Sequence, residues 1–504
     1  MTITPFHIQE LAEEIGGYLE QTDLAYCARV CKIWHSAFSP LLHQHIVHSD
    51  VSRKKISLWT GIQRYSCHTR SLTVATSTFP ELQLLGTDCR RITTLSLGPC
   101  GQANQPRLWC TWVMALIACN PSIHTLRFHL SDPLDHTLFR ERNILEHLPE
   151  LKHLSILNDR YPVASSTKSN GVFESILAYG SQLESLSYEV LYGGPILEVG
   201  CVGADISCTD SPPWTNLASL TIHDIDGRRE SELLKHCSYL KHYMTKVDFR
   251  RNGYESLHQL AHSATTDYPL CLEHLEVSQM QGPWTAGALD DILRASAGSP
   301  GLKTFSVIHS GVSDMTMKTL LTHHAVSLEK VVMNNVPWTS PSDLLVLLTA
   351  CPQLRHLETA MWSEKPWMKD LVQVPWKCFE LQFLHLKTRQ RGRTPSGTVI
   401  QWDPSEYDAD SIKSSSPQRQ FWSRIGALKK LRSLHLNTES RHRSYPKPLS
   451  FLREDIKYLC GLKQLQEFQI PPWPEFMSTT VKDELLLKRP GLLVENIDEM
   501  QLLS

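Results

Sequence analysis

Ionisable and aromatic side chains recur beside a short apolar pattern in the second half of the chain. Such side chains form charge-assisted hydrogen bonds and ion pairs with other proteins. We therefore predict a protein-binding patch between residues 246 and 435. Its candidate members are Lys246, Asp248, His274, Glu276, Lys330, His356, Glu358, Phe383, His385 and His435. A solvated face without a partner is the alternative interpretation, because exposed strand faces are polar in any case.

The same residues do not indicate catalysis or metal binding. The histidine spacing follows the repeat described below rather than that of a metal-ligand set. The chain contains no Gly-x-Gly-x-x-Gly, Gly-x-x-x-x-Gly-Lys-Ser/Thr, His-Glu-x-x-His or Gly-x-Ser-x-Gly sequence. Paired carboxylates at Asp290 and Asp291 fall on a predicted helix after Gly287, where we expect a solvated face. We predict a binding protein without catalytic residues, cofactor or metal; an enzyme with an unrecognised site is a minor alternative.

A repeated apolar phrase predicts the elements that position the patch. Apolar residues at relative positions 1, 4 and 6 return about every 30 residues. Its copies are Ile92-Leu95-Leu97, Ile123-Leu126-Phe128, Leu151-Leu154-Ile156, Leu183-Leu186-Tyr188, Leu217-Leu220-Ile222, Met244-Val247-Phe249, Leu272-Leu275-Val277, Leu302-Phe305-Val307, Leu328-Val331-Met333, Leu354-Leu357-Thr359, Leu381-Leu384-Leu386, Leu431-Leu434-Leu436 and Leu465-Phe468-Ile470, with a weaker one at Thr69-Leu72-Val74. Each phrase predicts a short strand whose alternate side chains enter a core.

Helical phrases such as residues 112–119 and 344–351 usually precede the strand phrases. Neither element can bury its apolar side alone, so the units must stack. Because a helix is wider than a strand, the stack should curve into a horseshoe with parallel strands on the concave face and helices on the convex face. The chain resembles the leucine-rich-repeat family over residues 66–473. The predicted fold class is therefore α/β, a leucine-rich-repeat solenoid.

The remaining segments complete a predicted domain plan. Residues 388–420 form an insertion, either a tolerated surface loop or one that grips a partner or is phosphorylated. We predict a linker or first cap at residues 49–65 and a C-terminal cap at residues 474–504. The scattered cysteines include no Cys-x-x-Cys pair and are interpreted as small buried hydrophobes.

Residues 1–48 are predicted to form a separate all-α module. Apolar residues from Ile8 to Leu19 keep helical spacing, and a second helix can begin near Asp23 and include Val30 and Trp34. Two short helices cannot bury both of their apolar surfaces against each other. The module is therefore either a helical cap on the repeats or a docking element for a partner.

The same residues resemble an F-box. The resemblance rests on Ile8-Gln9-Glu10-Leu11, Ile15, Leu19, Asp23-Leu24, Val30-Cys31-Lys32, Trp34 and Pro40-Leu41-Leu42. Gln9 replaces the proline that is usual in the family, and His43 replaces a frequent tryptophan. The resemblance implies docking on a Skp-type adaptor, with contacts expected from Ile8, Gln9, Glu10, Leu11, Ile15, Leu19, Val30 and Trp34.

Together, the two resemblances imply a substrate-recognition subunit of a cullin-type (SCF) ubiquitin ligase. The module would dock on the adaptor, and through it on the cullin–RING ligase, while the repeats would bind an unidentified target protein. The alternative is a leucine-rich-repeat interaction scaffold without ubiquitin transfer.

Charge and hydropathy set further limits. Fifty basic and 52 acidic side chains give a net charge of −2, which provides no field for nucleic acid or anionic lipid. The sequence has neither an apolar run long enough to span a bilayer nor the pattern of a secretory signal. We expect a cytoplasmic or nuclear protein with no membrane or nucleic-acid partner.

Overall fold

The computed structural model describes a large part of the 504-residue chain. The described residues are 11, 14–48, 66–74, 89–98, 106–130, 138–139, 143–158, 170–190, 214–223, 230, 233–234, 236–237, 239–246, 260–261, 270–278, 283–298, 300–308, 312–334, 341–362, 371–389, 417–439, 453–470 and 479–496. They divide into two compact units. Unit 1 contains Met1–Ile225 and His236–Tyr239, and unit 2 contains Asp226–Lys235 and Leu240–Ser504.

Unit 1 begins with a small helical region and continues as parallel strands. Helices α2 (Gln21–Cys27) and α3 (Lys32–Leu42) precede the strands, which pair side by side in chain order. The strands are β1 (His45–His48), β2 (Ser71–Val74), β3 (Thr94–Leu97), β4 (Thr125–Leu130), β5 (His153–Asn158), β6 (Ser185–Val190) and β7 (Ser219–His223). Between them come η2 (Ser66–His68), α6 (Pro106–Ala118), η4 (Ile144–His147), α8 (Asn170–Tyr179) and η6 (Gly180–Gln182).

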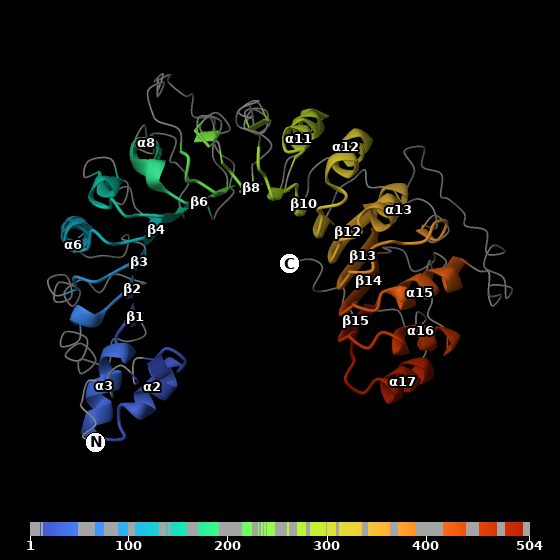
Figure 1. Ribbon diagram of the computed structural model, residues 1–504, viewed down its shortest axis with the longest axis horizontal. Helices are drawn as coiled ribbons and strands as arrows, with labels where there is room; N and C mark the ends of the chain where they lie inside the picture. Colours follow the sequence, from blue (N-terminus) through green and yellow to red (C-terminus); the bar gives the residue numbers. More distant parts are fainter. Residues whose placement is uncertain are drawn as a thin grey trace. The chain divides into compact units, whose positions relative to one another are not determined.

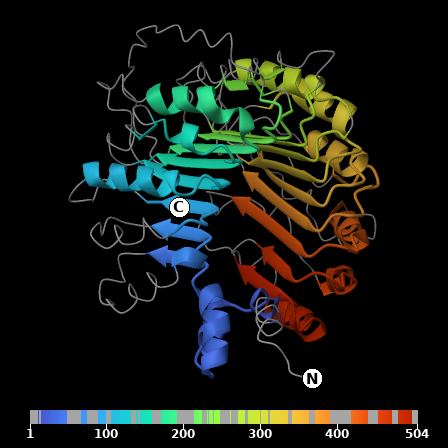
Figure 2. The ribbon, with the colours of Figure 1, turned by 60° about the vertical axis from the view of Figure 1, so that its left-hand side comes forward.

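Unit 2 also consists of parallel strands with helices between them. Its parallel strands are β8 (His242–Lys246), β9 (His274–Ser278), β10 (Thr304–Ile308), β11 (Lys330–Asn334), β12 (His356–Trp362), β13 (Phe383–Arg389), β14 (Ser433–Glu439), β15 (Glu467–Ile470) and β16 (Leu493–Asn496). Its helices are α11 (Pro283–Ala295), α12 (Asp314–His324), α13 (Pro341–Ala350), α15 (Pro417–Ala427), η9 (Arg453–Asp455), α16 (Ile456–Cys460) and α17 (Thr479–Lys488). Within this unit the helices lie along one side of the strands (Figures 1 and 2).

The core of each unit is built from the repeated apolar phrase. In β9, Leu275 and Val277 are fully buried while His274 and Glu276 remain partly exposed. Leu357 of β12 and Leu384 of β13 pair in register and are also fully buried. Parallel pairing without slippage keeps every buried position above its equivalent, so leucines stack between the strands and the helices. The fold is a leucine-rich-repeat solenoid of the α/β class, as predicted.

One strand phrase was predicted at the wrong place. The strand register pairs Tyr243 with Leu275 and Thr245 with Val277, so the repeat phrase is Leu240-Tyr243-Thr245 rather than Met244-Val247-Phe249. Both Tyr243 and Thr245 are buried. The polar residue Thr245 occupies a core position here. The apolar residues that begin four positions after Leu240 have the same spacing as the repeat, which led to the wrong prediction.

Parallel pairing also extends beyond the predicted solenoid limits. Strand β1 lies within the predicted N-terminal module, and β16 lies within the predicted C-terminal cap. The bounds of the predicted insertion overlap described structure, since Thr388 and Arg389 belong to β13 and residues 417–420 begin α15. The rest of that insertion and the predicted linker at 49–65 lie outside the described residues.

Candidate protein-binding surfaces

Side chains that alternate with the core leucines form a polar and aromatic surface on β11–β15. We call Lys330, His356, Glu358, Phe383, His385, Ser433, His435 and Glu467 the strand-face patch. The register places His356, Phe383 and Ser433 in one row and Glu358, His385 and His435 in the adjacent row. Six of the ten residues predicted for the target site therefore lie together in unit 2.

A histidine pair and a glutamate form the most connected part of the strand-face patch. The rings of His385 and His435 stack with centroids 3.6 Å apart. His435 Nε2 lies 3.1 Å from Glu467 Oε2. The Ser433 hydroxyl donates to Glu467 Oε2 over 2.8 Å, and the Gln469 amide donates to Glu467 Oε1 over 3.0 Å. The Glu467 carboxylate is thus held by groups from β14 and β15.

The surroundings of Glu467 favour its ionised form. Burial raises the pKa of the carboxyl, but hydrogen bonds from Ser433 and His435 and the nearby charges of His435 and His385 outweigh it, so the pKa is lowered. The sequence analysis ended the patch at residue 435 and left Glu467 out. The alternation of the Leu465-Phe468-Ile470 phrase does predict Glu467 on the strand face, and the strand register pairs it with Ser433.

A second glutamate lies at the other end of the aromatic residues. Asn334 Nδ2 donates to Glu358 Oε1 over 2.8 Å, and His356 Nε2 lies 3.8 Å from Glu358 Oε2. The His356 ring is 5.4 Å from that of Phe383, whose exposed fraction of 36% is high for a phenylalanine. The strand-face patch therefore presents aromatic surface between two carboxylates.

Three of the other four predicted target-site residues lie on strands β8 and β9 of unit 2. His274 and Glu276 are on β9, where the ring of His242 stacks on that of His274 with centroids 4.1 Å apart. Lys246 is the last residue of β8 and pairs with Ser278, while Asp248 lies outside the described residues. The residues in register with His274 and Glu276 are His242 and Met244, because of the displaced phrase.

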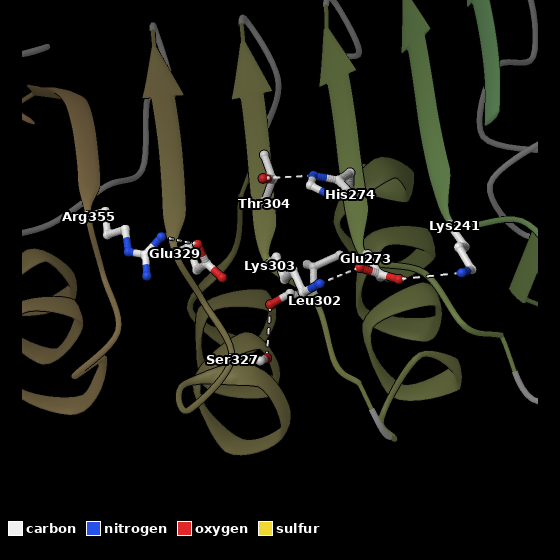
Figure 3. A network of polar contacts seen from close by, with 9 residues as sticks. All are labelled: Lys241, Glu273, His274, Leu302, Lys303, Thr304, Ser327, Glu329 and Arg355. Atoms are coloured by element: carbon white, nitrogen blue, oxygen red, sulfur yellow. Dashed lines mark hydrogen bonds and ion pairs between the residues drawn. The ribbon is translucent and has the colours of Figure 1, made fainter. Parts of the chain in front are cut away.

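His274 is also held from the neighbouring strand. Its Nδ1 is 2.9 Å from Thr304 Oγ1 (Figure 3). Burial is the main reason that the His274 pKa is lowered, and the charge of His242 adds to this effect, while Glu273 opposes it. His274 is therefore packed against His242, and its charged form is disfavoured.

Charged residues immediately before the strands form a separate ladder along unit 2. Glu273 lies 2.5 Å from Lys303 Nζ and 3.9 Å from Lys241 Nζ, and Arg355 lies 3.2 Å from Glu329 (Figure 3). The hydrogen bond from Lys303 lowers the Glu273 pKa despite the opposing effect of burial. These pairs, in which the basic partner is exposed, join neighbouring repeats of unit 2.

The N-terminal helices bury few side chains and expose many apolar ones. Leu24, Ala28 and Phe38 form a small core, and Leu19 packs against it. Among the predicted adaptor contacts, Leu11, Ile15, Val30 and Trp34 remain exposed by 57%, 45%, 65% and 42%. Tyr18, Tyr26 and Ile33 are further exposed apolar residues that are not among the predicted adaptor contacts. Ile8, Gln9 and Glu10 lie outside the described residues.

Trp34 and Gly16 both take part in the packing of the N-terminal helices. The Trp34 ring packs edge-on against Phe38 at 5.5 Å, so part of Trp34 supports the core. A Cβ atom on Gly16 would come within 2.2 Å of Leu41 Cδ1, so a larger residue there would require the Leu41 side chain to shift. His43, at the position where an F-box frequently has tryptophan, is half-buried, and its backbone carbonyl accepts a hydrogen bond from the Thr69 hydroxyl.

The carboxylate pair on α11 differs from its predicted solvated state. Asp290 is only 8% exposed and lies 2.5 Å from Arg294, one helical turn away. Asp291 is more exposed than Asp290. Among the described residues, no group of three or more His, Cys, Asp or Glu side chains is arranged to hold a metal ion. Within the same part of the chain, no helix has the length and apolar character needed to cross a membrane.

Similarity to known proteins is confined to structure. No protein-family model matches the chain, and no curated protein matches it. A chain in the crystal structure of the yeast Rad7 and Elc1 complex is similar, with 14% sequence identity and a TM-score of 0.40. The match covers 79% of this chain and 96% of that chain. The assignment of the fold rests on the strand pairing and buried leucines of this chain itself.

Proposed function

We propose that the chain is a non-catalytic substrate-recognition subunit of a cullin-type ubiquitin ligase. Its N-terminal module docks on a Skp-type adaptor, and the strand-face patch binds the target protein. Other subunits carry out ubiquitin transfer. The chain acts by raising the effective concentration of the target near the ubiquitin-carrying enzyme.

The exposed apolar side chains of the N-terminal module carry this proposal. Leu11, Ile15, Tyr18, Tyr26, Val30, Ile33 and Trp34 are all more than two-fifths exposed within a module of a few turns. Burial of apolar surface is the dominant favourable term in most protein–protein association. Apolar residues gathered on a small module mark an interaction site more often than an unpartnered surface. The F-box resemblance of the same residues supports a Skp-type adaptor as the partner.

The strand-face patch supports the target-binding half of the proposal. Its members come from strands that the buried leucines hold in fixed register, so the surface is organised before a partner arrives. Partly buried groups such as Glu358 and His435 have limited conformational freedom, which lowers the entropic cost of binding. Solenoids commonly use such extended surfaces to bind proteins.

Copurification with the Skp-type adaptor from the same source tests the docking step. We expect the full-length chain to form a stoichiometric complex that an Ile15→Asp, Val30→Asp double variant loses. Both side chains are exposed, so the helical core should persist, as circular dichroism and the thermal midpoint can check. Leu487→Asp is the matched control, because Leu487 is 82% exposed on helix α17 of unit 2.

Failure of the unaltered chain to bind the adaptor would overturn the ligase role. Equal adaptor binding by the double variant and the control would reject this surface as the docking site. Leu19 is unsuitable for the test, because it packs against the module core and its replacement would unfold the helices.

A scaffold without ubiquitin transfer is the second candidate, and the position of His43 favours it. Burial, followed by the charges of His35 and His68, lowers the His43 pKa, and Thr69 next to β2 hydrogen-bonds to its carbonyl. The backbone of the residue that replaces the frequent F-box tryptophan thus helps to attach the module to the first strands. Retained target binding without any adaptor complex would support the scaffold.

A further inference from the structure

Four aromatic rings adjoin one another on strands β12–β14. The His356 ring lies 5.4 Å from Phe383 and 6.0 Å from His385, and His385 stacks on His435 at 3.6 Å. All four side chains belong to the two adjacent rows of the strand face. A continuous aromatic surface therefore spans three strands.

Carboxylates close this aromatic surface at both ends. Glu358 lies beside His356 on β12, and Glu467 lies beside His435 on β15. Asn334, Ser433 and Gln469 donate hydrogen bonds that hold the two carboxylates in place. The lowered pKa of Glu467 is consistent with a negative charge at that end at neutral pH.

Negative charge beside aromatic faces suits a cation that is also planar. An arginine guanidinium can stack on an aromatic ring while its N–H groups bind a carboxylate in a bidentate geometry. A lysine ammonium provides a charge but cannot stack or bind in a fork. An acidic segment would bring its carboxylates against Glu358 and Glu467, and the like charges would repel.

We infer that the strand-face patch recognises an arginine-bearing segment of the target protein. The guanidinium groups lie over the Phe383 and histidine rings and pair with Glu358 and Glu467. This inference rests on the target-binding half of the proposed function and names the chemistry of the bound segment. Lys330 is the cation on the neighbouring strand, in register with His356, and it opposes binding at that edge.

Fluorescence polarisation with designed peptides tests the inference on the full-length chain. The probe is a labelled glycine–serine peptide with two arginines, measured at physiological salt. In the matched peptides citrulline or lysine replaces arginine. We expect the citrulline peptide to bind at least tenfold more weakly, because it keeps the shape and loses the charge, and the lysine peptide to bind several-fold more weakly.

Variants locate the binding surface. Glu358→Gln and Glu467→Gln should each weaken binding of the arginine peptide by roughly threefold to tenfold, and Phe383→Leu by about threefold. Lys330→Glu should strengthen binding by about threefold, a gain that damage to the fold cannot imitate. Glu189→Gln is the control, because Glu189 is a strand-face carboxylate on β6 in unit 1.

Equal binding of the arginine and citrulline peptides, or no binding of either, would overturn the inference. The inference would also be overturned if Glu189→Gln weakened binding of the arginine peptide as much as Glu467→Gln does. The adaptor experiment remains a separate readout. An adaptor complex without peptide binding removes only this inference, whereas peptide binding without an adaptor complex removes only the ligase role.

Discussion

The imidazole rings of His385 and His435 stack 3.6 Å apart, with their planes only 12° from parallel. The two residues lie 50 positions apart in the sequence, and the strand register alone brings them together. His435 then reaches Glu467 on the next strand. The repeat therefore converts distant single histidines into one connected polar surface.

Glu467→Gln should lower stability at neutral pH but not in acid. The folded-state pKa of Glu467 is lowered, so its ionised form stabilises the fold above the ordinary glutamate pKa of about 4.3, and this contribution disappears as the pH falls through the folded-state value. We expect a loss of about 1 kcal/mol in the free energy of unfolding near pH 7. Urea denaturation at several pH values measures it.

Glu454→Gln is a suitable control for that experiment, because Glu454 is an exposed carboxylate on η9. A difference between the unaltered chain and Glu467→Gln that stays constant down to about pH 3 would contradict the assigned ionisation.

The buried positions of the strands were predictable because side chains two residues apart in a strand point to the same side, and the apolar residues have this spacing. Leu275 and Val277, or Leu384 and Leu386, are two residues apart and enter the core together. The prediction failed at β8 because Thr245 is buried where the pattern expects an apolar residue. Strand β1 was missed for a related reason, since Ile46 is its only buried residue among those whose side chains are described.

The surfaces were only partly predictable. Alternation identified His356, Glu358 and His385 as outward residues, but the sequence does not say that Glu467 would complete their network. In the N-terminal module, helical spacing marked both Leu19 and Ile15 as apolar. It could not tell that Leu19 packs on the core while Ile15 stays exposed, because that depends on how the helices meet.

Buried polar residues at or just after the ends of helices were not predicted at all. Asn120 accepts a hydrogen bond from the backbone N–H of Ile92, the first apolar residue of the preceding repeat, and donates to two carbonyls. His324 accepts from the N–H of Leu302, which holds the same place in its repeat. Nothing in the spacing of these residues separates them from surface asparagine or histidine.

His324→Asn should therefore be tolerated, whereas His324→Leu should lower the free energy of unfolding by about 1–3 kcal/mol. Asparagine can reproduce the acceptor and donor roles that Asn120 has, while leucine leaves the buried Leu302 N–H without its acceptor. Denaturant unfolding of both variants measures the difference. Similar losses for both would show that the imidazole acts through its shape alone.

The same histidine should make stability depend on pH. Burial lowers the folded-state pKa of His324, so the unfolded chain takes up the proton first. Its contribution is complete above the ordinary histidine pKa of about 6.5 and declines as the pH falls below it. His324→Asn should show a shallower loss of stability between about pH 7 and pH 5. An unchanged slope would contradict this assignment.

Added salt should reduce the stability contribution of the charged ladder but not that of the core. Glu273→Gln removes the pairs with Lys241 and Lys303, whose ammonium groups are exposed, and should cost at most about 0.5 kcal/mol at low ionic strength. The effect should vanish near 1 M salt, where the Debye length is about 3 Å. In contrast, Leu357→Ala in the core should cost about 2–5 kcal/mol at either salt concentration. A salt-independent loss for Glu273→Gln would instead indicate a packing role.

The rate at which each cysteine of the native chain is alkylated should depend on how deeply its thiol is buried. Cys351 and Cys378 are buried, and burial raises the pKa of each thiol to about 12, so almost no reactive thiolate forms at neutral pH. Cys31, Cys67 and Cys119 are exposed, contrary to the prediction that the cysteines are buried. We expect iodoacetamide to modify these three within minutes and to spare Cys351 and Cys378 until denaturant is added. Peptide mass spectrometry measures each site. Modification of Cys351 at the rate of Cys31 would show that the helical side of unit 2 opens under native conditions.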